Sequence, residues 1–241
     1  MAYGYKNLNY CDLQEAYDEA LINYSDLAND IAYYFDTKTC NLRTNDYVHY
    51  CELAYHVEFV PFTFTGKPKR IFAGSLMIGN HGFYEIGFNS SVNEGRQNFT
   101  KLHEINHLVN DVQTGKPGQS FSDVFARGDY SPEEQYCEAV ANFGAAMMQI
   151  PEEALVAMIL KTKNLKNEFS KEFSSSYGAN YNRLLDYLMY QQKLNFSDAQ
   201  VLANDYEGNP LTSGLSKVIS SNVVNNPEYI NIINSVILYA E

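Results

Sequence analysis

The sequence has few features that would direct the chain to a membrane. No apolar run approaches the roughly 18 residues that a bilayer-spanning helix needs. The first residues lead into polar, acidic sequence and contain no apolar core of the kind found in a signal peptide. We therefore expect a cytoplasmic protein with no membrane segment.

Cysteine and basic residues are also scarce. The four cysteines show no CxxC pairing, and in a chain of 241 residues they are too few for a disulfide framework. Lysine and arginine number 17 against 29 acidic residues, which gives a formal charge of −12. Because nucleic acids are polyanions, we expect no direct nucleic-acid binding. A basic protein surface is the better electrostatic partner.

What the sequence does contain is the composition and patterning of a folded domain, with 45% hydrophobic residues. Apolar residues recur every three or four positions from Asp12 to Phe35, which predicts a helix, and a second short helix is expected from Asn45 to Tyr55. Three runs rich in aromatic and β-branched residues then predict strands joined as successive antiparallel hairpins. These runs are Val57–Phe64, Ile71–Ile78 and Phe83–Phe88.

Two helix starts follow the predicted strands. The S-x-x-E pattern of Ser91–Glu94 is a capping box, and it predicts a helix that continues to about Asn110. A polar stretch from Gln113 to Tyr130 is expected to be a loop. Ser131–Glu134 forms a second capping box with proline at the first helical position, and Pro151 should end that helix. The remainder of the chain has mostly helical patterning.

The first of these capped helices carries the HExxH pattern as His103-Glu104-Ile105-Asn106-His107. Residues four apart lie one turn apart on the same helix face, so both imidazoles can bind one metal ion. Glu104 is offset by about 100° and lies beside the metal, where it can act as general base toward the attacking water. A random HExxH occurs in roughly one such chain per hundred, so the pattern favours a metal site.

The second capped helix offers a third ligand, which catalytic zinc needs in addition to one open position. Glu138 and Asn142 are four residues apart and share one helix face. Glu138 can bind the metal, and Asn142 can hydrogen-bond the far nitrogen of a ligand imidazole. Taken alone, Glu138 would be read as a solvated carboxylate, but the HExxH helix upstream reverses that interpretation.

Together these motifs resemble the ImmA/IrrE family of metallopeptidases, over roughly residues 45–160. The resemblance rests on HExxH followed by Glu138-x-x-x-Asn142-Phe143-Gly144-Ala145-Ala146 and then Pro151. It implies that His103, His107 and Glu138 bind zinc and that Glu104 is the catalytic base. Gly144 departs from the family, which often has phenylalanine at that position.

The resemblance also implies a function. Members of this family act in prophage and mobile-element control or in stress responses, and they cleave or antagonise a helix-turn-helix repressor that is usually encoded beside them. A regulatory zinc peptidase with such a transcriptional repressor as its substrate is therefore expected. Two alternatives stay open: a non-catalytic antirepressor that captures the regulator, and a general peptidase that digests unrelated peptides.

The expected fold is α+β, with a small antiparallel sheet packed on a zincin-like HExxH helix and a glutamate helix, and with a helical C-terminal part. The expected domain limits are an N-terminal helical segment at 1–44, the metallopeptidase core at 45–160 and a helical extension at 161–241.

Several other polar residues are weaker candidates for a role in the site. Three histidines are expected to serve the structure alone: His49, His56 and His81. Tyr130 or Tyr136 could stabilise an oxyanion near the glutamate helix. Arg183 could bind a substrate carbonyl, although a surface ion pair is the more ordinary role.

Overall fold

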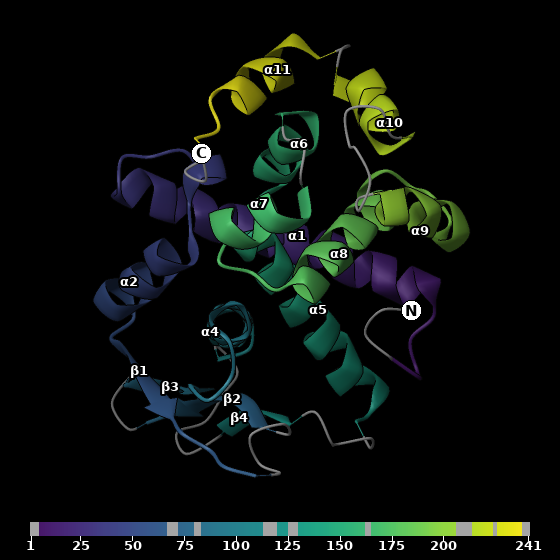
Figure 1. Ribbon diagram of the computed structural model, residues 1–241. Coiled ribbons are helices and arrows are strands. Elements are labelled where there is room, and N and C mark those ends of the chain that lie inside the picture. The colour runs from purple at the N-terminus through teal and green to yellow at the C-terminus, as the bar shows by residue number, and fades with distance from the viewer. Residues whose placement is uncertain are drawn as a thin grey trace. The chain divides into compact units, whose positions relative to one another are not determined.

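The computed structural model describes residues 5–66, 72–79, 83–112, 120–124, 130–161, 165–205, 214–223 and 226–237 (Figure 1). The chain divides into two compact units. Unit 1 contains Met1–Ile31 and Arg43–Gln149, and unit 2 contains Ala32–Leu42 and Ile150–Glu241. The domain limits expected from the sequence stay a prediction. The two units are defined by contacts between residues, whereas a domain is defined by its ability to fold on its own.

The described residues of unit 1 include a four-stranded sheet with the strand order β1-β3-β2-β4. The strands are β1 (Val57–Phe62), β2 (Phe72–Ile78), β3 (Tyr84–Asn89) and β4 (Ser120–Val124). β2 pairs antiparallel with both β3 and β4, whereas β1 pairs parallel with β3. Together with the helices described below, this sheet confirms the α+β class expected from the sequence.

The sheet is mixed, so the expectation of a purely antiparallel sheet of successive hairpins is wrong. β1 pairs with β3 and not with β2, its neighbour in sequence. Gly87 of β3 allows this pairing, because a β-carbon there would overlap the ring of Phe62 in β1. Pro61 also fits the edge position of β1, where a missing N–H is tolerated. β4 lies inside the stretch 113–130 that was expected to be a loop.

The HExxH motif lies on α4 (Glu94–Asn110), which packs on one face of the sheet against β2 and β3 (Figure 1). The capping box expected at Ser91 is wrong, because the N-cap is Asn93. The side chain of Asn93 accepts a hydrogen bond from the backbone N–H of Arg96 at 3.0 Å. The Ser91 hydroxyl instead accepts one from the backbone N–H of Phe64 at 2.8 Å.

Glu138 lies on α5 (Pro132–Gln149), which packs along α4. Its predicted capping box is confirmed: Ser131 N–H donates to the Glu134 carboxylate at 2.8 Å, and Glu134 N–H donates to the Ser131 hydroxyl at 3.2 Å. The two helices approach closely at Gly144, where a β-carbon would overlap the buried side-chain amide of Asn106. This packing accounts for the glycine at position 144.

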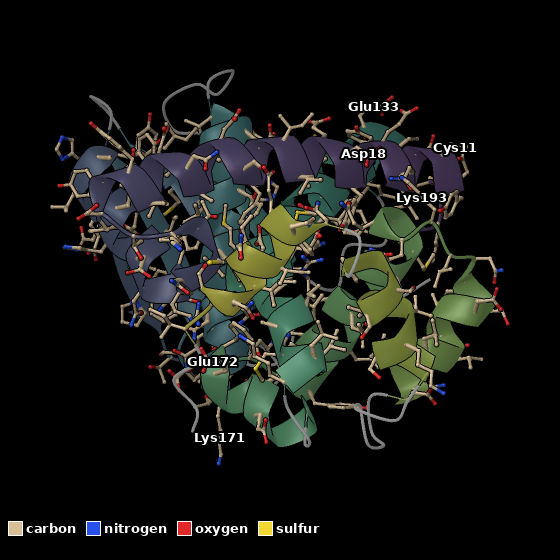
Figure 2. The ribbon with its side chains drawn as sticks, turned by 90° about the horizontal axis from the view of Figure 1, so that it is seen from above. Cys11, Asp18, Glu133, Lys171, Glu172 and Lys193 are labelled. Carbon is tan, nitrogen blue, oxygen red and sulfur yellow. The ribbon has the colours of Figure 1, made fainter. Side chains whose placement is uncertain are left out.

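The two predicted N-terminal helices are confirmed as α1 (Tyr10–Tyr34) and α2 (Thr44–Ala54). In unit 1, α2 contacts α4 and α5. The buried face of α1 meets α5 where the ring of Tyr17 packs edge-on against Phe143, with 5.4 Å between ring centroids. Cys11 and Asp18 lie on the exposed side of α1 (Figure 2).

Unit 2 is mostly helical in its described residues, as the sequence predicts. Its helices are η1 (Thr39–Asn41), α6 (Glu152–Lys161), α7 (Leu165–Glu172), α8 (Tyr177–Asp186), the π-helical η4 (Tyr187–Gln191), α9 (Phe196–Asn204), α10 (Gly214–Val223) and α11 (Pro227–Asn234). α6 contacts η1, α7, α10 and α11. Lys171 projects into solvent from the end of α7, while Glu172 beside it is buried (Figure 2).

Arg183 belongs to the interior of unit 2. Its side chain is 2% exposed, and its Nε donates a hydrogen bond to the carbonyl of Ile150 at 3.0 Å. The surface ion pair considered as its ordinary role is therefore wrong, since the side chain is buried.

None of the described helices is by itself long and apolar enough to cross a membrane. The consecutive helices α5 and α6 reach that threshold only when they are counted together, by length and composition.

Candidate metal centre

Three side chains from two helices meet in unit 1. α4 supplies His103 and His107, and α5 supplies Glu138. The two imidazole Nε2 atoms are 3.1 Å apart. Glu138 reaches both rings: Oε2 is 3.4 Å from Nε2 of His103, and Oε1 is 3.6 Å from Nε2 of His107. Both histidines are buried and Glu138 is partly exposed.

The spacing of these atoms fits one metal ion. Two donors that each lie about 2.0–2.2 Å from a tetrahedral zinc ion are roughly 3.3–3.6 Å from one another. The two histidine Nε2 atoms are 3.1 Å apart, slightly closer than this range, and their separations from the glutamate oxygens are 3.4 and 3.6 Å. Two imidazoles and one carboxylate are also a donor set that suits zinc with an open fourth position. The group could therefore hold a metal ion.

The electrostatics of Glu138 favour its charged form. Burial by itself would raise the pKa of this carboxyl, but the hydrogen bond with His103 and the charges of His103 and His107 outweigh burial. The pKa of Glu138 is therefore lowered from its ordinary value. A deprotonated carboxylate is the form that binds a cation.

Asp111 is a residue of the site that the sequence reasoning missed. It is the C-cap of α4, and its Oδ2 lies 2.6 Å from Nδ1 of His107. A carboxylate at this nitrogen fixes the ring orientation and keeps Nε2 available to a metal. The i, i+4 spacing from His107 to Asp111 was the available signal, because it places both residues on one helix face.

Asn142 does not take the role expected for it. Its Nδ2 donates a hydrogen bond to the hydroxyl of Tyr5 at 2.7 Å, so the expected bond to a ligand imidazole is wrong. The Tyr5 hydroxyl in turn donates to the backbone carbonyl of Glu138 at 3.3 Å. Asn142 and Tyr5 therefore fasten the N-terminal segment to α5 at the residue that faces the histidines.

Glu104, the expected base, lies against the sheet and is fully buried. A β-carbon at Gly74 of β2 would come within 2.8 Å of Oε1 of Glu104, and it would overlap the methyl group of Thr100. Glycine at this position of β2 therefore makes room for the Glu104 carboxylate between helix and sheet.

The weaker candidates lie apart from this cluster or outside the described residues. His49 is exposed and lies 3.6 Å from Glu52 on its own helix. His56 is exposed with a φ of 54°, and His81 lies outside the described residues. The Tyr136 hydroxyl donates to Glu19 at 2.8 Å, and the backbone carbonyl of Tyr130 accepts from Gln135 at 3.1 Å. An oxyanion role for either tyrosine stays a prediction.

Comparison with known families bears on this geometry directly. Residues 64–185, just over half of the chain, match the family described as the IrrE N-terminal-like domain, Peptidase_M78. The chain belongs to this family. The resemblance read from the HExxH helix and the glutamate helix is thereby confirmed, and the matched region contains all four residues expected to form the site. No curated protein matches the chain.

Membership of the IrrE-like family makes this a protein of metallopeptidase type. The matched region includes α4 and α5, the two helices that carry the group that could hold a metal.

Proposed function

We propose that the chain is a zinc metallopeptidase that hydrolyses a peptide bond in a protein substrate. The observation that carries this proposal is the approach of Glu138 to the paired Nε2 atoms of His103 and His107, at separations that suit a tetrahedral ion. A bound zinc ion would supply Lewis acidity toward the scissile carbonyl and would lower the pKa of water toward about 7.

The protein's own groups perform the remaining chemistry. Asp111 holds the ring of His107 through Nδ1, which leaves Nε2 as the donor. Glu104 follows His103 directly on α4, and its carboxylate accepts the proton of the attacking water and returns it to the leaving amine. The contact with β2 at Gly74 restrains that carboxylate, so that proton transfer begins from one orientation.

The proposed substrate is a helix-turn-helix transcriptional repressor encoded next to the gene for this chain. The resemblance to the ImmA/IrrE family supports this class of substrate. The charge of −12 supports it as well, because an acidic protein attracts the basic surface of a DNA-binding protein at low salt.

Cleavage of the neighbouring repressor tests the proposal. The purified chain with zinc is incubated with that repressor, and the fragments are followed by mass spectrometry. Glu104→Gln should lower the rate by about 10²–10⁴-fold, because it keeps the size of the side chain and removes proton acceptance. Glu94→Gln is the matched control: it is the same change on the same helix, at an exposed position in the first turn.

A second outcome would point to capture instead. If the zinc-loaded chain leaves the repressor intact, and if Glu104→Gln relieves repression in cells as well as the wild type does, the protein acts as a binding antirepressor. Digestion of unrelated peptides at similar rates would indicate a general peptidase.

A further inference from the structure

A cavity of about 340 Å³ lies in unit 1 beside the candidate metal centre. Its walls come from α1, from the C-terminal end of α4 and from the first half of α5. Neither the two histidines nor Glu138 is among its lining residues, so it is a separate space. Its volume lies in the range of small-ligand sites, which is roughly 300–1,000 Å³.

The polar groups of this cavity are acidic or neutral. Glu19 of α1 and Asp111 at the end of α4 supply two carboxylates, and Asn23 and Asn110 supply side-chain amides. Among the described residues, no lysine, arginine or histidine belongs to the lining. Val140 and Ala141 of α5 add apolar surface, so the space combines anionic acceptors with a wall suited to a hydrocarbon stem.

The cavity touches the candidate metal centre through Asp111 and Cys137. The carboxylate of Asp111 lines the cavity and also meets Nδ1 of His107 at 2.6 Å. Cys137 lines it from the residue that precedes Glu138 on α5. A group bound in the cavity would therefore lie behind the imidazole of His107, on the side away from Nε2.

We propose that this cavity is a binding site for a guanidinium-bearing side chain or molecule, held by the carboxylates of Glu19 and Asp111. Guanidinium presents a planar fork of N–H donors that matches carboxylates, and the amide oxygens of Asn23 and Asn110 are further acceptors. Two sources offer this chemistry: an arginine side chain of a polypeptide, and a free small cation.

A nuclear magnetic resonance titration of the ¹⁵N-labelled, zinc-loaded full chain tests this site. The probe is N-acetyl-arginine amide, and its neutral isostere N-acetyl-citrulline amide is the control. The arginine probe should shift the side-chain amide signals of Asn23 and Asn110 and the backbone signals of Cys137 and Ala141. The citrulline probe should bind at least about tenfold more weakly, because it lacks the charge.

Two variants that each remove one negative charge from α1 then test whether the Glu19 carboxylate holds the probe. Glu19→Gln should weaken binding of the arginine probe by about tenfold, as expected for losing one charge-assisted contact. Asp26→Asn removes the same unit of charge from an exposed position of the same helix outside the cavity, and it should leave binding unchanged. Equal weakening by both variants would indicate only a long-range charge effect and would overturn the proposal.

The source of the guanidinium is decided by a second pair of probes. Tighter binding of a capped Ala-Arg-Ala tripeptide than of butylguanidinium would assign the site to a polypeptide side chain, and the reverse order would assign it to a free cation. Equal shifts with arginine and citrulline probes, or no shift at tens of millimolar arginine probe, would refute the site. None of these measurements needs peptidase activity, so the failure of this inference is distinct from a failure of the proposed function.

Discussion

The backbone of Gly74 and the carboxylate of Glu104 lie so close that no side chain fits at position 74. A β-carbon there would come within 2.8 Å of Oε1 of Glu104 and would overlap the methyl group of Thr100. A strand residue with no side chain is thus part of the surroundings of the expected base, and it sets how deeply α4 packs on β2.

Gly74→Ala should therefore destabilise the fold by about 1–3 kcal/mol and lower peptidase activity, because α4 must move off the sheet. Zinc content should stay unchanged, since the atoms nearest to the new β-carbon belong to Thr100, Glu104 and Gly87 and to none of the candidate ligands. The matched control is Gly178→Ala, where the new β-carbon meets no atom within 4 Å. Thermal unfolding and elemental analysis give the two readouts, and equal melting temperatures for both variants would contradict the packing argument.

The purified chain should contain about one zinc ion per molecule. His103→Ala or His107→Ala should abolish tight binding, because only two of the three donors then remain. His49→Ala changes an exposed histidine on α2 and should keep the metal. Elemental analysis after gel filtration measures the content. Stoichiometric zinc in a double variant of His103 and His107 would exclude this site.

Asp111→Asn should weaken zinc binding by roughly 10–100-fold while the fold is kept, because the carboxylate that orients His107 is lost. Competition with a chromogenic chelator measures the dissociation constant. Asp26→Asn serves as the control for net charge. An unchanged constant in Asp111→Asn would show that the α4 backbone alone orients the imidazole.

Gly144→Ala should lower the free energy of unfolding by about 1–3 kcal/mol, because the new methyl group overlaps Asn106. Asn106→Ala alone should also destabilise the protein, since its Nδ2 donates to the Leu102 carbonyl at 2.9 Å. The double variant should be more stable than the sum of the two effects predicts. Urea unfolding measures this coupling, and strict additivity would mean that the two side chains do not compete for one space.

Tyr5→Phe should lower stability by about 1–3 kcal/mol, because Asn142 loses its acceptor and the carbonyl of Glu138 loses a donor. Zinc should also be held less tightly, as Glu138 is less restrained on α5. Tyr33→Phe is the control, because that side chain is 91% exposed. If Tyr5→Phe and Tyr33→Phe give equal unfolding curves and equal zinc affinities, the N-terminal segment has no role in positioning Glu138.

The features that were predictable from the sequence depend on short stretches of chain. The HExxH spacing placed two imidazoles on one face of α4, and the Ser131 capping box marked the start of α5 correctly. Both follow from helix periodicity and from side chains that satisfy nearby backbone groups. The family resemblance then selected Glu138 from the many carboxylates of the chain.

The features that were missed depend on residues far apart in sequence. The parallel pairing of β1 with β3 needs a glycine at position 87, where the ring of Phe62 leaves no room for a β-carbon. The side chain of Asn142 donates its hydrogen bond to Tyr5, which lies 137 positions away. Nothing local distinguishes such a partner from any other polar residue. Asn93 is the N-cap in place of Ser91 for a related reason. The Ser91 hydroxyl already accepts a hydrogen bond from the backbone N–H of Phe64, 27 positions earlier.

The division of the candidate ligands between two helices has a consequence for control of the protein. α4 carries both imidazoles and is followed directly by its C-cap Asp111, so those three groups keep their arrangement when the neighbouring helices move. Glu138 comes from α5, whose spacing from α4 is set where Asn106 meets Gly144. A ligand or partner that separates these helices would remove one donor of three and leave the histidine pair intact. Such an event would release a bound ion and switch the centre off reversibly, since the histidine pair would stay in place for the ion to bind again when Glu138 returns.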